Sequence, residues 1–296
     1  MRIVIIGTGG RVGGALARHF RLAGHAVVGF DRKALDLSRS EIIRDRLEPL
    51  RFDTVLLSAA LTHLDYAEAH PEEAFAINAE GPALVAAICA ARGARLIHFS
   101  TDYVYDGTRP GLRTEEETPA PISVYGQSKL AGERAVLEKT DGQALIARVS
   151  WVFGPDRPAF PDHIISKAQT ADTVEAVTDK FSSPTSSLDL GQWLEPFAAG
   201  EWRGQGGVVN FCNTGGPVSW HSYGQEALDG AAACGVPLKT RMVQPVRLVE
   251  MSAFKAQRPV HTAMNGEKLA ALLGVTPRRW EEALREYLAV YYAKNV

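Results

Sequence analysis

The sequence has few cysteines and little net charge, and its apolar start is short. Its 296 residues include three cysteines, without a CxxC pair or a Cys/His cluster: Cys89, Cys212 and Cys234. No zinc site is therefore predicted, and unpaired cysteines favour a reducing cytoplasm. A net charge of −2 lacks the basic excess expected of a nucleic-acid or membrane-surface binder. The start, MRIVIIGTGG, is too short for a spanning helix and lacks a cleavage site, so we expect no export signal.

Short apolar runs alternate with helical patterns over the first 153 residues. Five runs rich in β-branched residues predict buried strands, in the order RIVIIG, HAVVGFD, DTVLLSAA, ARLIHFSTD and QALIARVSW. Segments between them predict helices, including residues 11–23 and a long helix over residues 71–93 with a bend near Gly81-Pro82. The alternation predicts an α/β fold with a doubly wound parallel sheet, whose ligands bind at the carboxyl ends of the strands.

The pattern becomes irregular after residue 153. Prolines and glycines multiply, and we interpret residues 154–296 as a smaller, irregular α/β part that mainly binds the substrate. Segments near residues 180–190 and 207–213 are expected to return to the first domain. The stretch PRRWEEALREYLAVYYAKN predicts an amphipathic helix near the C-terminus.

A glycine-rich loop follows the first strand. Gly7, Gly10 and Gly13 form a G-x-x-G-x-x-G pattern where the chain turns from strand to helix. Glycine lets backbone N–H groups approach a pyrophosphate, whose charge the helix N-terminus stabilises. Because an acid, Asp31, ends the second strand, we interpret residues 1–153 as a dinucleotide-binding domain rather than a domain with a ligand-free turn. The predicted cofactor contacts in the loop are Gly7, Gly9, Gly10, Arg11 and Val12.

Charges near the end of the second strand bear on the choice of cofactor. Asp31 suits the adenosine ribose hydroxyls of NADH, whereas Arg32, Lys33 and the loop residue Arg11 suit the 2′-phosphate of NADPH. Three cations beside one acid favour NADPH, with NADH as the alternative. Two further residues are predicted at the adenine, one as an acceptor for its amino group and one packing beside the ring: Asp36 and Leu37.

Tyr125 and Lys129 stand four residues apart in SVYGQSKLAGE, which predicts the first turns of a helix. On one helix face, a lysine ammonium favours the phenolate and lowers the tyrosine pKa, which makes the tyrosine a usable acid. The lysine can also hold ribose hydroxyls of a cofactor. A solvated helix face is the alternative interpretation. Thr101 ends the fourth strand, where its hydroxyl either holds a substrate carbonyl or caps the strand.

Seven segments resemble those of one family and follow in the same order. They are GTGGRVG, AEAHPEEAFAINAEGP, STDYVYDG, YGQSKLAGE, RVSWVFG, DKFSSPTSSLDL and RPVHTAMNGEKL, which together extend over nearly the whole chain. The chain is similar to the dTDP-4-dehydrorhamnose reductase family of extended short-chain dehydrogenases/reductases. The resemblance implies a Rossmann-type domain and an NADPH-dependent reductase of a nucleotide-linked 4-keto-6-deoxy sugar, and it allows a homodimer.

The resemblance also implies roles for individual residues. Tyr125 would protonate the carbonyl oxygen as the nicotinamide delivers hydride, with Lys129 tuning it and binding the ribose. Thr101 would orient the carbonyl. The residues implied along the cofactor groove are Ala59 and Ala60, and those implied beside the sugar are Tyr103, Trp151 and Arg258. A plain surface arginine is the alternative for the last of these, and no metal ligands are predicted.

Several features bear on neighbouring activities. The run Thr101-Asp102-Tyr103 lacks the second acid with which related dehydratases eliminate water, so a plain reductase is favoured and Asp102 is expected to be structural. An epimerase on the same scaffold and a non-catalytic dinucleotide-binding regulatory subunit remain as alternatives. The chain departs from the family at Gly9-Gly10, at Leu57-Ser58 and in the stretches AALTHLDYAE and GPDRPAFPD, which leaves the identity of the sugar open.

Overall fold

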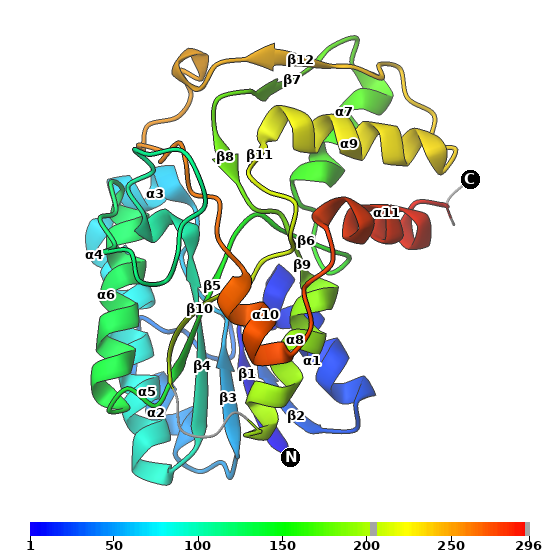
Figure 1. Ribbon diagram of the computed structural model, residues 1–296. Coiled ribbons are helices and arrows are strands. Elements are labelled where there is room, and N and C mark those ends of the chain that lie inside the picture. The colour runs from blue at the N-terminus through cyan, green and yellow to red at the C-terminus, as the bar shows by residue number, and fades with distance from the viewer. Residues whose placement is uncertain (202–205, 294–296) are drawn as a thin grey trace.

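The computed structural model describes residues 1–201 and 206–293. Residues 202–205 and 294–296 lie outside the described residues. All of them belong to the predicted substrate part, and residues 294 and 295 also belong to the predicted C-terminal helix. The larger part is a sheet with helices on its two sides. A smaller group of helices and short strands lies beyond the carboxyl ends of the sheet strands (Figure 1).

Six parallel strands form the central sheet, in the order β10-β5-β4-β3-β1-β2. Their bounds are β1 (Arg2–Ile6), β2 (Ala26–Phe30), β3 (Thr54–Leu57), β4 (Arg95–Thr101), β5 (Leu145–Val149) and β10 (Gly207–Asn210). β1 pairs with β2 on one side and with β3 on the other, so the strand order reverses there and a crevice opens between the carboxyl ends of β1 and β3. The predicted doubly wound parallel sheet is confirmed.

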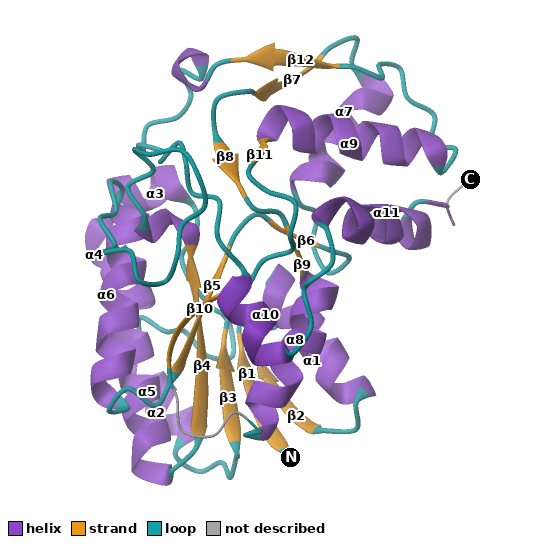
Figure 2. Ribbon diagram, in the orientation of Figure 1, coloured by secondary structure: helices purple, strands orange, loops and turns teal. Residues whose placement is uncertain are grey.

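Helices cover both faces of the sheet (Figure 2). Along β1, Ile3 and Ile5 pack into the core under α1 and α8, whereas Val4 and Ile6 pack under α2, α5 and α6. These helices are α1 (Arg11–Leu22), α2 (Ser40–Leu47), α5 (Gly81–Arg92), α6 (Val124–Lys139) and α8 (Ser187–Ala199). Because both faces are covered at the centre of the sheet, β1 and β3 are almost continuously buried and apolar instead of alternating.

The predicted long helix consists of three joined pieces. They are α4 (Pro71–Phe75), a π-helical turn (Ala76–Glu80) and α5, preceded by the short α3 (Leu64–Ala69). The bend expected at Gly81-Pro82 is thus a π-helical turn just before it, because Pro82 has no N–H with which to continue the α-helical ladder. Among the described residues, this is the one helix whose length and apolar composition would allow it to cross a membrane. Its apolar residues instead pack against the sheet in the core.

The second part of the chain surrounds its own apolar cluster. Helices α7 (Phe160–Thr170), α9 (Trp220–Ala233) and α11 (Trp280–Tyr291) supply most of it. Three strand pairs accompany them, namely β6 (Val152–Phe153) with β9 (Thr185–Ser186), β7 (Val174–Val177) with β12 (Val243–Val246), and β8 (Phe181–Ser182) with β11 (Val218–Ser219). Helix α8, strand β10 and Leu269 of α10 (Glu267–Leu273) instead pack in the layer of the sheet.

A buried ion pair joins α6 to the sheet. Arg148 of β5 donates to both carboxylate oxygens of Glu133, at 2.9 and 2.6 Å, and to the hydroxyl of Tyr105 at 2.9 Å. The two charged side chains are 2% and 3% exposed. A bidentate pair with this burial fixes both the position and the rotation of the helix.

Replacing Glu133 by alanine leaves the Arg148 guanidinium buried without its carboxylate, so we expect the free energy of unfolding to fall by about 3–5 kcal/mol. Urea unfolding followed by circular dichroism measures the change. The matched control is Glu138→Ala near the end of the same helix, which removes an exposed ion pair with Lys139 and is expected to cost less than about 1 kcal/mol. Equal losses in the two variants would contradict the role given to Glu133.

Candidate active site

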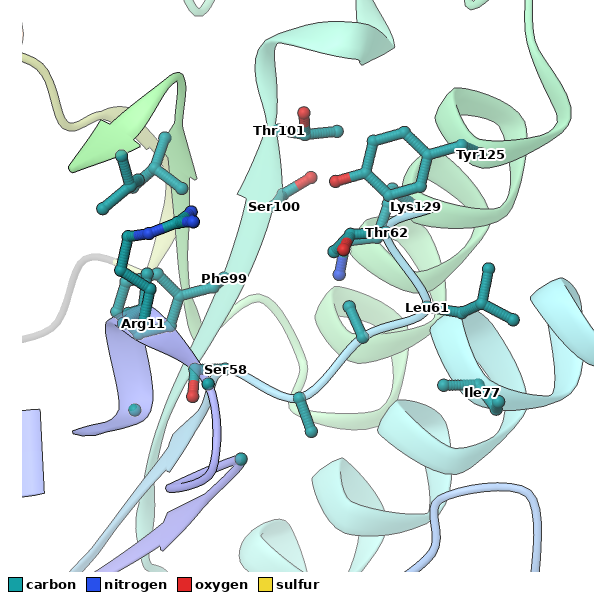
Figure 3. A pocket seen from close by; sticks show the side chains of 18 of the residues that line it. Arg11, Ser58, Leu61, Thr62, Ile77, Phe99, Ser100, Thr101, Tyr125 and Lys129 are labelled. Carbon is teal, nitrogen blue, oxygen red and sulfur yellow. The ribbon is translucent and has the colours of Figure 1, made fainter. Parts of the chain in front are cut away.

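A cavity of about 850 Å³ opens at the carboxyl ends of β1, β3, β4 and β5. The sequence-predicted residues that line it are Gly7, Gly9, Gly10, Arg11, Val12, Asp31, Arg32, Asp36, Leu37, Ala59, Ala60, Thr101, Tyr103, Tyr125, Lys129 and Trp151. Of the predicted site residues, Arg258 alone is not part of this lining. Figure 3 shows Thr101 and Tyr125 across the cavity from Arg11. Residues widely spaced in the sequence therefore meet in one cavity.

Two glycines of the motif after β1, Gly7 and Gly13, have no room for a side chain. Gly7 has a φ of +106°, and a Cβ atom there would lie 2.6 Å from the nitrogen of Ala59. A Cβ atom on Gly13 would lie 2.2 Å from the carbonyl oxygen of Gly7. Helix α1 starts at Arg11 after an N-cap, Gly10, that provides no side-chain hydrogen bond, and its first turn contains no acid. Uncapped N–H groups beside the cavity fit the pyrophosphate of a dinucleotide.

Polar residues after β2 border the same cavity. The exposed guanidinium of Arg32 lies 3.4 Å from the carboxylate of Glu73. The carboxylate of Asp36 accepts from the nitrogen and the hydroxyl of Ser38, at 3.0 and 2.8 Å. Burial raises the pKa of Asp36, but these hydrogen bonds outweigh it and hold the pKa below its usual value. An ionised Asp36 is a pure acceptor, as the predicted contact with an adenine amino group requires.

Arg11 lies elsewhere than the sequence suggests. We expected it to join Arg32 and Lys33 around a 2′-phosphate. Its guanidinium donates instead to the backbone oxygens of Arg157 and Pro158, at 3.2 and 2.5 Å. Arg11 is therefore engaged with the loop that leaves β6, and only the other two cations remain beside Asp31. A contact with a loop so distant in sequence cannot be read from charge counts.

Thr101 and Tyr125 meet where β4 ends and α6 begins. The Ser123 hydroxyl caps α6 by accepting from the nitrogen of Gly126 at 3.2 Å, and Tyr125 follows in the first turn. Burial raises the pKa of Tyr125 to about 12, against a hydrogen bond with Thr101 that lowers it. The nearby carboxylate of Asp102 also raises this pKa. A tyrosine with this pKa keeps its proton at neutral pH.

Lys129 is fully buried and contacts a residue that the sequence did not single out. Its ammonium lies 3.3 Å from Nε2 of His98, and burial lowers the pKa of Lys129 to about 8, while Glu133 raises it. Since an ammonium only donates, Nε2 of His98 accepts and its Nδ1 carries the proton, an assignment made from the hydrogen bond. Our expectation of a lowered pKa for Tyr125 is corrected: burial is the largest cause, and the net pKa is raised. The sequence signal that could have indicated His98 is its position as a histidine among apolar residues of a predicted strand.

Aromatic rings form one wall of the cavity. Trp151 stacks on Trp220 with centroids 5.6 Å apart, and Trp220 stacks on Phe160 with centroids 6.1 Å apart. The ring of Tyr103 meets that of Tyr125 edge-on at 5.8 Å. Trp151 has a φ of +41°, which is rare for a residue with a side chain and costs backbone energy. Trp220 and Phe160 were absent from our prediction because they come from irregular segments without a motif.

Arg258, predicted beside the sugar, is held by other groups. It pairs with the carboxylate of Asp65 at 3.1 Å, and its guanidinium lies 3.6 Å from the ring centroid of Phe254. The hydrogen bond from Arg258 lowers the pKa of Asp65 to about 2. This arrangement anchors the segment around residue 258 to α3, and it gives the arginine a structural role.

The comparisons with known proteins agree with this geometry. Residues 1–293 match the family model of the RmlD substrate binding domain. The chain belongs to the RmlD family. Among RmlD-family relatives, the dTDP-4-dehydrorhamnose reductase of Aggregatibacter actinomycetemcomitans is 29% identical over 97% of this chain and 98% of its own. The dTDP-4-dehydrorhamnose reductase of Mycolicibacterium smegmatis is 35% identical over 97% of this chain and 85% of its own.

Solved structures with the name dTDP-4-dehydrorhamnose reductase are similar to this chain. The crystal structure of dTDP-4-dehydrorhamnose reductase from Bacillus anthracis in complex with NADP has a TM-score of 0.88 and 29% identity. The similarity covers 98% of this chain and 99% of that one. The corresponding reductase from Clostridium acetobutylicum also has a TM-score of 0.88, at 27% identity. The RmlD-type fold therefore extends over both parts of the chain.

A methyl group on Gly13 would lie 2.2 Å from the carbonyl oxygen of Gly7, so Gly13→Ala forces the glycine loop to move. We expect the Kd for NADPH to rise at least about 10-fold, or about 1.4 kcal/mol, in a titration of cofactor fluorescence. Gly224→Ala is the control, because a Cβ atom there makes only ordinary contacts from 3.5 Å outward. If a folded Gly13→Ala protein bound NADPH as tightly as the control, the loop would not be the cofactor site.

Proposed function

We propose that this chain is an NADPH-dependent reductase of a nucleotide-linked 4-keto-6-deoxy sugar, of the dTDP-4-dehydrorhamnose reductase type. The observation that carries the proposal is that the glycine loop, Thr101, Tyr125 and Lys129 line one cavity. A relative named dTDP-4-dehydrorhamnose reductase matches over 98% of its length, and a structure of that name was solved with NADP. Site chemistry and whole-chain similarity therefore support the same reaction.

Bound NADPH supplies the hydride that reduces the carbonyl carbon. In the proposed mechanism, Tyr125 donates its phenolic proton to the carbonyl oxygen, and its pKa of about 12 keeps that proton available at neutral pH. With substrate bound, the Thr101 hydroxyl, which donates to Asp102 in this structure, would turn to donate to the same oxygen. The ammonium of Lys129 stabilises the phenolate that remains and attracts the ribose hydroxyls of the cofactor.

The proposed cofactor preference rests on the residues after β2. Arg32 and Lys33 line the cavity near Asp31 and are available to a 2′-phosphate, whereas Arg11 is engaged elsewhere. Arg32, which is exposed and lies 3.4 Å from Glu73, and Lys33 still support NADPH over NADH. Gly7, Gly9, Gly10 and the start of α1 are proposed to hold the pyrophosphate, with Ala59 and Ala60 along the nicotinamide side, and Asp36 and Leu37 at the adenine.

The surroundings of Asp102 support reduction over water elimination. Its carboxylate is buried and accepts hydrogen bonds from the hydroxyls of Ser182 and Thr262 and from that of Thr101. An acid engaged in this way holds β4 to the second part of the chain. An epimerase that uses the same Tyr125 and Lys129 is the second candidate, and it predicts conversion of a nucleotide sugar without net oxidation of NADPH.

We further propose a division of roles along the chain. Residues 1–153 bind the dinucleotide, and residues 154–296 mainly bind the nucleotide sugar through Trp151 at their border and the rings beyond it. A cytoplasmic location is supported by the three cysteines, which form no disulfide in the described residues. A homodimer is compatible with the proposal, and size-exclusion chromatography with light scattering measures it.

Purified protein mixed with NADPH and dTDP-4-dehydrorhamnose is expected to oxidise the cofactor, seen as a fall in the absorbance of the reduced nicotinamide. Tyr125→Phe removes the proton donor, and we expect kcat to fall about 10²- to 10⁴-fold. Tyr66→Phe, which removes an exposed hydroxyl bonded to Glu73, is the control and should retain full activity. Product without NADPH oxidation would favour the epimerase, and full activity of Tyr125→Phe would refute the assigned acid.

The pH profile tests the state of Lys129. Its pKa of about 8 means that the ammonium is present below pH 8 and is lost as the pH rises, whereas Tyr125 stays protonated up to about pH 12. We therefore expect kcat/KM for NADPH to fall as the pH rises through about 8.

His98→Leu removes the acceptor for this ammonium and should move the descending limb of the profile to lower pH. The control is His70→Leu, whose imidazole contacts the backbone oxygen of Tyr66 away from the cavity, and it should leave the limb in place. A limb that stays near pH 8 in His98→Leu would exclude the histidine from this role.

A further inference from the structure

Lys180 is a buried cation behind the aromatic end of the cavity. The residue is fully buried just before β8, and its ammonium donates to the backbone oxygen of Pro259 at 2.7 Å. The same nitrogen lies 4.8 Å from the ring centroid of Tyr103, 5.8 Å from that of Trp220 and 5.9 Å from that of Trp151. All three distances are within the range of cation–π attraction.

The three rings come from separate parts of the chain. Tyr103 lies in the 3₁₀ turn after β4, Trp151 lies between β5 and β6, and Trp220 opens α9. All three line the cavity, whereas Lys180 does not appear in its lining. One ammonium outside the cavity lining thus contacts three rings that line the cavity. Trp151 also has a strained backbone, with a φ of +41°, and such a conformation persists only when contacts with neighbouring groups stabilise it. The cation–π contact with Lys180 is one of these contacts.

Burying a charge at this place has a cost that an apolar side chain would avoid. A methionine fills a similar volume without desolvating an ammonium. The charge is compensated by the Pro259 oxygen, by the three ring faces and by the carboxylate of Asp102, while Arg258 opposes it. Most of the groups that the charge attracts, namely the three rings and Asp102, therefore line the cavity.

We propose that Lys180 is a positioning residue for the substrate, which fixes Tyr103, Trp151 and Trp220 as a rigid wall at the sugar end of the cavity. The inference rests on the proposed function, which gives these rings to the nucleotide sugar. None of the groups described around this ammonium belongs to the glycine loop or to the predicted adenine contacts. Loss of the charge should therefore weaken the handling of the sugar substrate while leaving the handling of NADPH unchanged.

Lys180→Met tests the proposal in the full chain. We expect KM for dTDP-4-dehydrorhamnose to rise about 10-fold while KM for NADPH stays the same. We also expect the near-ultraviolet circular dichroism of the aromatic rings to weaken, because rings that lose a fixed position lose this signal. The matched control is Lys268→Met, whose ammonium donates to the backbone oxygen of Val208 at 2.8 Å and should change neither quantity.

Lys180→Gln is the second variant, because it keeps a hydrogen-bond donor toward Pro259 without the charge and so separates the cation from the hydrogen bond. It should reproduce the effects of Lys180→Met even if the latter folds poorly. A folded variant with both KM values unchanged, or with both raised equally, overturns the inference. If the wild-type protein does not oxidise NADPH with this sugar, the proposed function fails instead, and the circular dichroism signal alone decides the role of Lys180: an unchanged signal refutes it.

Discussion

The ion pair between Glu133 and Arg148 is the contact on which the rest of the site depends. It joins α6 to β5 through two hydrogen bonds, and its burial makes any rotation of the helix costly. Tyr125 and Lys129 lie on the turns of α6 before Glu133, so their directions follow from that anchor. The carboxylate also acts on Lys129 directly, since it raises the pKa that burial lowers. One side chain therefore helps to fix the position of both residues and favours the charged form of Lys129.

Much of the fold and part of the site follow from local patterns in the sequence. Strand β1 and its glycine loop could be predicted because an apolar run, a turn and a helix start are each fixed by neighbouring residues. Thr101 could be predicted at the cavity because parallel strands all end at one edge of the sheet. The sequence indicated a bend near Gly81-Pro82 but not its π-helical form, because that form depends on how the backbone relieves the missing N–H of Pro82.

The rest of the site depends on contacts between distant segments. His98 reaches Lys129 from a neighbouring element, and Arg11 bonds to a loop 146 residues further along the chain, not to a group at the end of β2 as expected. That loop is also held at Asp156, which pairs with Arg18 of α1 at 2.7 Å. Charge and spacing along the sequence carry no information on which distant partner a long side chain will choose, so tertiary contacts decided these positions.

The aromatic wall has a consequence for how the protein is maintained. Tyr103, Trp151, Lys180 and Trp220 are separated by long stretches of chain and meet only when both parts of the molecule have folded. A partly folded chain therefore has no complete wall, and a ligand that needs the wall binds only the native state. By mass action, such a ligand stabilises the native state by an amount that grows with the logarithm of its concentration above its Kd, which raises the melting temperature and slows degradation. The supply of substrate would thus regulate the lifetime of the protein that consumes it.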